Sequence, residues 1–256
     1  MPYIKVTYVA GQTVEIEKHF SGRYGKRGVK RGPRRAPTKK KQKEINRRKA
    51  VDNLRRLMNA NFGIGDWHLV LGYRREYSPK PEESKKHREK FLRDYRAWCK
   101  KVGRKVRYIA VTEYKNRRLH HHIVIEEMPS AVAYELWPYG RPSIKPLDSR
   151  GEYANLAAYL IKETDKTFRE DGAPQNKRWT QSKGLIIPKA KVEVIPAEKW
   201  REDPRPPKDH ILLRDTLMLG VDDFTGQPWQ RYTLLYTGPP KGEKDRAGRG
   251  RTDRVV

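Results

Sequence analysis

Three consecutive histidines, His120 to His122, precede the apolar run Ile123-Val-Ile125, a pattern that is typical of a buried strand. Side chains alternate between the two faces of a strand, so His120 and His122 point the same way and His121 points the opposite way. Two imidazoles that project together from a rigid strand can hold a divalent metal ion. The alternative interpretation is a surface patch of three histidines, or an incidental run, that binds nothing.

A carboxylate that could complete such a metal site lies shortly before the histidines. If Asn116-Arg117 forms the turn of a hairpin, antiparallel pairing sets Glu113 opposite His120, with their Cβ atoms about 5 Å apart. Glu113 is therefore the predicted third ligand beside His120 and His122, and this set leaves open positions for water and phosphate oxygens. A turn that is longer or shorter by one residue would point Glu113 away and leave it a surface carboxylate beside arginines.

A second pair of reactive residues follows the histidines, on a helix predicted over residues 152–165. Tyr159 and Lys162 are spaced i, i+3, so they are neighbours on that helix. A tyrosine phenol is a poor nucleophile at its ordinary pKa near ~10. Beside a lysine and a metal-bound phosphate it becomes a credible one, because Lys162 can neutralise phosphate charge while the phenol attacks. The alternative is a core aromatic residue next to a solvated lysine.

The composition indicates a polyanionic partner. Lys and Arg outnumber Asp and Glu by 58 to 31, which gives a formal net charge of +27 at pH 7. A charge excess of this size implies binding to nucleic acid or to an anionic membrane surface. The membrane role is disfavoured because no amphipathic apolar face adjoins the basic segment at residues 22–43. Nucleic acid is therefore the predicted partner, and no membrane partner is expected.

Three absences narrow the class of protein further. The sequence has no apolar run of about 18 residues and no signal-peptide h-region, which predicts a cytoplasmic location. Cys99 is the single cysteine, so an intrachain disulfide and a Cys-rich zinc finger are excluded, and its helical spacing with apolar neighbours predicts a core position. The pattern GxxxxGK[ST] does not occur, so no phosphate-loop ATPase motor is expected.

The segment at residues 22–43 is rich in Gly, Pro, Lys and Arg and contains no acidic residue. This composition predicts a mobile basic arm that contacts phosphates without reading sequence, whereas a merely solvated linker is the alternative. A helix is predicted to follow at residues 38–61. The candidate DNA-binding residues of the arm and this helix are Lys39, Lys40, Lys41, Arg47 and Arg48.

The elements that must position these residues follow from apolar periodicity and turn signals. The order β-α-β-β-α-β is predicted from strands at 67–73, 107–113, 119–126 and 142–146 and helices at 82–101 and 130–136. This is the split arrangement of ferredoxin-like and RRM-like folds. We therefore expect an α+β fold whose central antiparallel sheet carries the histidines on a central strand, with the tyrosine on a following helix.

Composition divides the chain into three parts. Residues 1–61 are expected to hold a small hairpin at 3–18, the basic arm and a helix. Residues 62–200 form the predicted main domain. Residues 201–256 are rich in Pro, Gly and charge, which predicts an extension with one strand at 232–236 and a disordered basic tail.

These motifs resemble those of HUH-superfamily endonucleases, in particular the rolling-circle replication initiators of small plasmids and phages. The stretch Leu119-His-His-His-Ile-Val-Ile125 resembles the HUH motif, and Ala158-Tyr-Leu-Ile-Lys162 resembles the tyrosine motif. The stretch Trp67-His-Leu-Val-Leu-Gly-Tyr73 is similar to the first, strand-forming motif, and Thr112-Glu-Tyr114 to the segment that often supplies the acidic ligand. The resemblance covers residues 62–200, a little over half of the chain.

Two departures from the family pattern bear on the site. The residue between the paired histidines is normally hydrophobic, and here it is His121. Strand alternation leaves the metal geometry intact, but a slipped register would use His121 instead. Tyr153 and Tyr159 are six residues apart and lie on different helical faces, whereas enzymes with two catalytic tyrosines carry them about one turn apart. The resemblance therefore implies a one-tyrosine enzyme.

The resemblance implies metal-dependent, site-specific nicking and rejoining of single-stranded or hairpin origin DNA. Mg²⁺ or Mn²⁺ would be held by His120, His122 and Glu113, and Tyr159 would form a 5′-phosphotyrosine bond that leaves a free 3′-hydroxyl. Rejoining needs no ATP, in agreement with the missing phosphate loop. A host helicase and polymerase would be further partners. A segment that follows the tyrosine helix in such initiators adds three candidate DNA contacts, Arg178, Ser182 and Lys183.

Two rival functions fit the same residues. Transposases and relaxases use the same kind of centre, so replication and mobilisation cannot be separated from the motifs alone. A non-enzymatic RNA- or DNA-binding protein, with merely structural histidines, would suit the charge and the βαββαβ order equally well.

Overall fold

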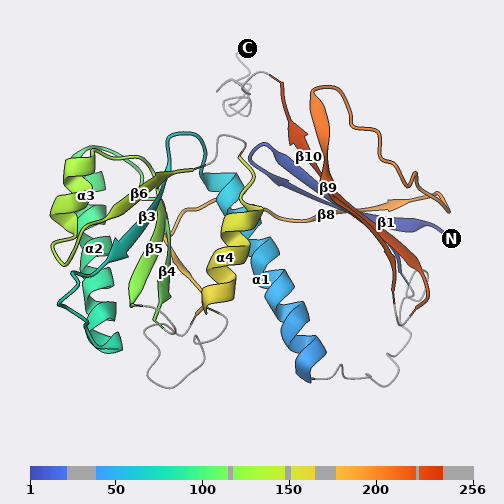
Figure 1. Ribbon diagram of the computed structural model, residues 1–256. Helices are drawn as coiled ribbons and strands as arrows, with labels where there is room; N and C mark the ends of the chain where they lie inside the picture. The colour runs from blue at the N-terminus through green and yellow to red at the C-terminus, as the bar shows by residue number, and fades with distance from the viewer. Residues whose placement is uncertain (22–38, 115–117, 148–150, 165–176, 223–224, 239–256) are drawn as a thin grey trace, which may run out of the picture.

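The structure, a computed structural model, describes residues 1–21, 39–114, 118–147, 151–164, 177–222 and 225–238. These residues form two five-stranded antiparallel sheets and four helices, as Figure 1 shows. The predicted α+β class is therefore confirmed. The greater part of the predicted basic arm, residues 22–38, and the predicted disordered tail lie outside the described residues.

One sheet, which we call the motif sheet, carries the histidine strand at its centre. Its strand order is β6-β3-β5-β4-β7, so β5 lies between β3 and β4. The order along the chain is compatible with the predicted ferredoxin-like core. The elements are β3 (Trp67–Gly72), α2 (Pro81–Lys101), β4 (Tyr108–Glu113), β5 (His120–Ile125), α3 (Ser130–Leu136), β6 (Ser143–Pro146) and β7 (Thr180–Gln181).

Helix α2 forms where its sequence favours both of its ends. Pro81 stands in the first turn, where its missing N–H costs nothing. The first turn carries acidic residues and the last turn carries Lys100 and Lys101, which complements the helix dipole. The buried residues of the helix, which include Phe91 and Cys99, recur at helical spacing. This apolar stripe packs with α3 on one face of the motif sheet, and Cys99 is a core residue as predicted.

The opposite face of the motif sheet is covered by α1 (Lys39–Asn61) and α4 (Ala154–Thr164). The apolar side chains of α1, which include Leu54 and Met58, are buried here. These side chains form one cluster with Val111 and Val124 of the sheet and Leu160 of α4. The packing of α1 against α4 therefore fixes which side of α4 faces strands β4 and β5.

The other sheet, which we call the terminal sheet, combines strands from both ends of the chain. Its order is β8-β1-β2-β10-β9, with β1 (Tyr3–Ala10), β2 (Thr13–Phe20), β8 (Lys191–Ile195), β9 (His210–Val221) and β10 (Pro228–Tyr236). The predicted hairpin at 3–18 is present, but it does not stand apart. The expected boundaries after residues 61 and 200 do not coincide with the sheets, because β2 pairs with β10 and β1 pairs with β8. An isolated two-stranded hairpin is marginal in water, and this pairing gives it partners.

The terminal sheet is fastened to α1 by a buried ionic network. Glu15 of β2 is 4% exposed and forms ion pairs with Arg55 and Arg56 of α1. Arg231 of β10 joins the same group, at 2.8 Å from Glu15 and 2.7 Å from Asp52 of α1. Two guanidiniums from the helix and one from the sheet thus neutralise two carboxylates at one interface. We call these five residues the Glu15 network.

A glycine allows the hairpin turn to approach the same helix. Gly11 has a φ of 59°, and a Cβ atom added to it would lie 2.0 Å from the backbone oxygen of Asn59. The left-handed conformation and the close approach both require glycine here. The turn is also tied to the helix by the side-chain amide of Asn59, which donates to the hydroxyl of Thr13 at 3.0 Å.

Among the described residues, no helix combines the length and the apolar character that a bilayer crossing requires.

Candidate metal centre and nucleophile

The β4–β5 hairpin sets the register that the candidate ligands need. Glu113 pairs with His120, and Val111 pairs with His122. Directly paired residues share one face of a sheet, so Glu113, His120 and His122 all project toward α1 and α4. The alternation that was predicted from the three consecutive histidines is therefore present in the sheet.

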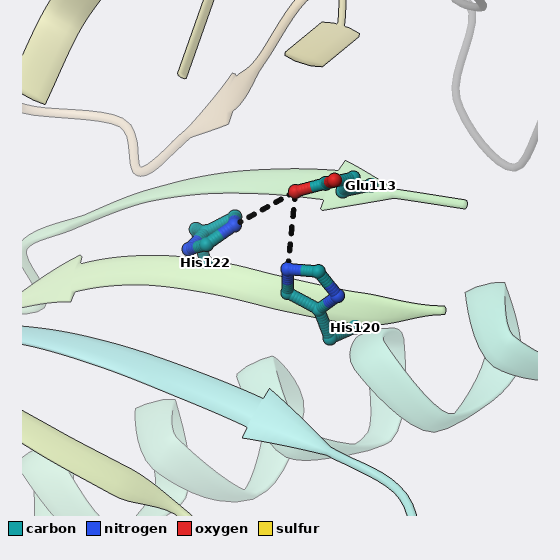
Figure 2. A group of neighbouring side chains, drawn as sticks. All are labelled: Glu113, His120 and His122. Atoms are coloured by element: carbon teal, nitrogen blue, oxygen red, sulfur yellow. Dashed lines mark hydrogen bonds and ion pairs between the residues drawn. The ribbon is translucent and has the colours of Figure 1, made fainter. Parts of the chain in front are cut away.

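The three side chains converge on one point, as Figure 2 shows. Glu113 Oε2 lies 3.1 Å from His120 Nε2 and 3.4 Å from His122 Nε2. One ligand atom from each residue falls within 4.8 Å of the others. Adjacent ligands on an ion with bonds of about 2.1 Å lie about 3 Å apart, so this donor set fits a small divalent cation. Glu113 and His122 are buried, so these two ligands are shielded from bulk water.

Nδ1 of each histidine is engaged by a neighbouring group, and for His120 the contact fixes the tautomer that leaves Nε2 free to bind a metal. His120 Nδ1 lies 2.7 Å from the backbone oxygen of Arg118, so Nδ1–H donates to that carbonyl. His122 Nδ1 lies 3.0 Å from Nε2 of His68, and the two rings stack with centroids 5.1 Å apart. With Nδ1 of each ring engaged, the Nε2 atoms of both rings lie toward Glu113. Hydrogen bonds of this kind orient metal-binding histidines in proteins generally.

Burial keeps the inner histidines neutral. Desolvation, together with the nearby charges of His68, His120 and Lys145, lowers the pKa of His122 to about 2. Desolvation also lowers the pKa of His68 to about 4, aided by Lys145 and His120. A neutral imidazole is the form that binds metal, so His122 needs no deprotonation at neutral pH.

His68 is the residue of this site that sequence reasoning did not include. It lies on β3, opposite Val124 of β5, and so reaches His122 diagonally across the same face. Its signal in the sequence is weak, because a single histidine in an apolar strand is more often structural. Knowing that β3 and β5 are neighbours, and in which register, is what identifies its contact.

Tyr159 stands at the edge of the metal cluster. Its hydroxyl lies 3.5 Å from Glu113 Oε2 and 3.5 Å from His122 Nε2, and its ring is perpendicular to that of His122. Lys162, the other predicted catalytic residue, is exposed one turn further along α4. Tyr153 is 3% exposed and belongs to the core between α1, α4 and the sheet. Of the two tyrosines considered, only Tyr159 therefore lies beside the cluster.

His121 occupies the opposite face of the motif sheet. It is fully buried, and its two ring nitrogens lie 2.9 Å from the hydroxyl of Thr112 and 3.1 Å from that of Tyr73. Thr112 in turn accepts a hydrogen bond from Arg88 at 2.6 Å. Desolvation first, and the charge of Arg88 second, lower the pKa of His121 well below its usual range. The slipped register in which His121 would replace a ligand is not the register of this sheet.

Buried neutral histidines make folding stability dependent on pH. The pKa values of His68, His121 and His122 are lowered in the folded protein, so only the unfolded chain takes up their protons as pH falls below 6.5. The stability they contribute is complete above pH 6.5 and is lost as pH falls toward the folded values. At pH 5 the loss is about 2 kcal/mol for each such histidine. We expect urea unfolding in EDTA to show this loss between pH 7.5 and 5.0.

The variant His121→Val measures how much of this pH-dependent loss of stability comes from His121. It should be less stable at pH 7.5, because the hydroxyls of Thr112 and Tyr73 lose a partner. Its further loss between pH 7.5 and 5.0 should be smaller than that of the wild type by about 2 kcal/mol. An identical pH dependence in the two proteins would show that His121 is not held neutral by the fold.

The candidate DNA-binding residues of the first helix lie together on the surface. Lys40, Lys41, Arg47 and Arg48 are exposed in the N-terminal half of α1, and Lys39 begins that helix. In Figure 1 this half of α1 extends beyond the sheets, and its free end points the same way as the C-terminal end of α4. The helix thus presents a row of cations on the side of the molecule where α4 ends.

The three candidates from the segment after α4 differ in their surroundings. Arg178 donates to the backbone oxygen of Asn46 in α1 at 3.4 Å, and Lys183 is exposed. Ser182 is 6% exposed, and its hydroxyl accepts a hydrogen bond from the backbone N–H of Tyr108 at 3.1 Å. This contact gives Ser182 a structural role at the edge of β4.

The fold and the site together define an α+β protein with a candidate Glu-His-His metal centre and an adjacent tyrosine. Residues 66–168 match the model of a protein family described as Replication-associated protein ORF2/G2P. The match supports a rolling-circle, Rep-type replication initiator and confirms the resemblance predicted from the motifs. The matched segment contains Glu113, His120, His122 and Tyr159. No curated protein and no solved structure matched the chain.

Proposed function

We propose that this protein initiates rolling-circle replication by nicking and rejoining single-stranded DNA through Tyr159. One observation carries the proposal: within the segment that matches the replication-associated family, a tyrosine hydroxyl lies 3.5 Å from two atoms of a Glu-His-His cluster. Tyr159 also packs against the core between α1, α4 and the sheet, but that packing does not require its hydroxyl to face the ligand atoms.

Mg²⁺ or Mn²⁺ is the proposed ion, since three protein ligands leave positions open, whereas a structural zinc site is closed by four. One carboxylate and two imidazoles would occupy three positions and leave others for phosphate oxygens. When bound, such an ion would act as a Lewis acid toward the scissile phosphate. Nδ1 of His120 and His122 is already engaged by Arg118 and His68, so these rings would not need to reorient.

The chain's own residues then account for the transfer. The Tyr159 oxygen forms a bond to phosphorus while the bond from phosphorus to the 3′ oxygen breaks. The phenol loses its proton as it attacks, and the departing 3′ oxygen gains one. The products are a 5′-phosphotyrosine and a free 3′-hydroxyl, and the reverse reaction rejoins the strand without ATP. Lys162, exposed one turn beyond Tyr159, would offset the negative charge that the DNA brings to this end of α4.

The basic N-terminal half of α1 would hold the DNA near this centre. Its cations are exposed, and electrostatic contacts with phosphates supply affinity without sequence reading. Single-stranded or hairpin origin DNA is the proposed substrate, and a host helicase and polymerase would use the free 3′-hydroxyl that remains.

The proposal predicts a covalent conjugate with a defined polarity. The wild-type protein is incubated with a pool of random-sequence single strands and Mn²⁺, and the products are separated on a denaturing gel. A label at the 3′ end of the DNA should migrate with the protein, whereas a label at the 5′ end should appear in a released fragment. EDTA should prevent both. A shifted band in native gels without any conjugate under denaturing conditions would make the protein a binder and contradict nicking.

A further inference from the structure

A cavity of about 350 Å³ lies on the other side of His68 from the metal cluster. Its walls come from both sheets and from α4. Lys145 lies in β6, Leu213 and Asp215 lie in β9, Asn155 lies in the first turn of α4, and Glu152 lies just before that helix. The terminal sheet therefore completes a space that the motif sheet alone would leave open. Small-molecule sites have volumes of roughly 300–1,000 Å³, so the cavity has room for one nucleoside.

Two residues connect the cavity with the proposed reaction centre. His68 lines the cavity and also contacts His122 at 3.0 Å, so a single ring separates the cavity from a metal ligand. Asn155 and Tyr159 are spaced i, i+4 on α4 and therefore lie on one face of the helix, about 5–6 Å apart at Cβ. A DNA strand whose phosphate lies at Tyr159 would thus have a neighbouring nucleotide within reach of Asn155.

The lining of the cavity has the chemistry of a nucleobase site. Leu213 of β9 and Leu235 of β10 supply apolar walls of the kind that pack against the faces of an unstacked base. The Asn155 amide offers both a donor and an acceptor, and Glu152 and Asp215 add carboxylates. The carboxylates disfavour a phosphate inside the cavity, whereas they can accept hydrogen bonds from an amino group.

One carboxylate oxygen of the lining lacks a donor. Glu152 Oε2 accepts from the backbone N–H of Ala154 at 3.0 Å, but Oε1 is buried and has no hydrogen-bond partner among the described residues. Buried polar atoms are nearly always paired, and an unpaired acceptor is costly. Because Oε1 is buried, an exocyclic amino group that enters the cavity would supply the missing donor only after the Glu152 carboxylate turns toward it.

We propose that this cavity binds an unpaired adenine or cytosine of the DNA strand next to the cleaved phosphate. In both bases an amino group adjoins a ring nitrogen that accepts, which suits a carboxylate beside an amide; thymine carries a carbonyl in place of that amino group. Lys145 at the wall would meet the backbone phosphate of the bound nucleotide. The inference rests on the proposed function for its substrate and names the base that the site would select.

Binding of short strands tests the cavity without requiring cleavage. Fluorescence anisotropy in EDTA compares a strand of twenty thymidines with strands in which one central thymidine is replaced by cytidine or deoxyadenosine. The wild type should bind the substituted strands about tenfold more tightly. Asn155→Ala removes the amide, and Leu213→Trp fills the cavity from the other sheet. Either variant should bind all strands with the wild-type affinity for the thymidine strand.

Asn53→Ala is the matched control, because Asn53 is exposed on α1 and does not line the cavity. It should retain the tenfold preference. A preference that is equal in the wild type and both cavity variants would overturn the inference. Conjugate formation in Mn²⁺ is scored separately. If the wild type forms the conjugate but shows no base preference, only the inference about the cavity is refuted. If the base preference depends on the cavity residues but no conjugate forms, only the nicking proposal is refuted.

Discussion

Replacing Tyr159 by phenylalanine should abolish the covalent protein–DNA conjugate and leave binding of single-stranded DNA within about twofold of the wild type. The substitution removes one oxygen, which is the only atom of the side chain that can bond to phosphorus. The ring that packs at a right angle against His122 remains, so the ligand cluster should keep its shape. Denaturing gels of 3′-labelled strands measure the conjugate, and anisotropy in EDTA measures binding.

Two further tyrosines serve as controls for this result. Tyr134 is exposed on α3, away from the cluster, and Tyr134→Phe should form the conjugate at the wild-type rate. Tyr153→Phe tests the one-tyrosine mechanism, because Tyr153 is buried in the core beside α1. A conjugate that persists in Tyr159→Phe and disappears in Tyr153→Phe would exchange the roles of the two residues and refute our assignment.

Metal binding should show the second large effect, graded by the distance of each residue from the ion. Calorimetric titration with Mn²⁺ should detect no binding to His122→Ala or Glu113→Ala, since each removes one of three convergent ligand atoms. His68→Ala should weaken binding by about 10–100-fold, because His68 only orients His122 through Nδ1. Conjugate formation at limiting Mn²⁺ should follow the same order.

The control for the metal series is His121→Val. Its side chain faces away from the cluster, so Mn²⁺ affinity should stay close to that of the wild type. Circular dichroism before each titration confirms that the variants are folded. A loss of affinity in His121→Val as large as that in His122→Ala would place the ion on the opposite face of the sheet.

The motif sheet could be predicted because its information is local. Each of its longer strands is a short apolar run, and each helix has an apolar stripe with turn residues at its ends. The two-residue alternation then decides that His120 and His122 share a face, and the short sequence separation between Glu113 and His120 favours the pairing by which Glu113 joins them. These inferences need no knowledge of distant contacts.

The terminal sheet could not be predicted in the same way. Strand β2 pairs with β10, which is more than two hundred residues away, and no signal in either sequence segment identifies the strand with which it pairs. Strand β9 also lacks a regular alternation, because its register against β10 shifts between Met218 and Leu213. A bulge of this kind breaks the two-residue period that identifies a strand. The contact of His68 was missed for a related reason, since it depends on strand order.

The Glu15 network has a consequence for how the protein can be divided. The segment with the family motifs relies on α1 to cover its sheet, and α1 is held by the Glu15 carboxylate of β2 and the Arg231 guanidinium of β10. Removing one partner of a buried ion pair leaves an uncompensated charge, at a cost of about 3–5 kcal/mol. A fragment trimmed to residues 66–168 would therefore lack α1, the helix that covers the sheet at the proposed reaction centre. Deleting β10 would remove Arg231 and so weaken the packing of α1 over the histidine cluster, although β10 itself is not part of that cluster.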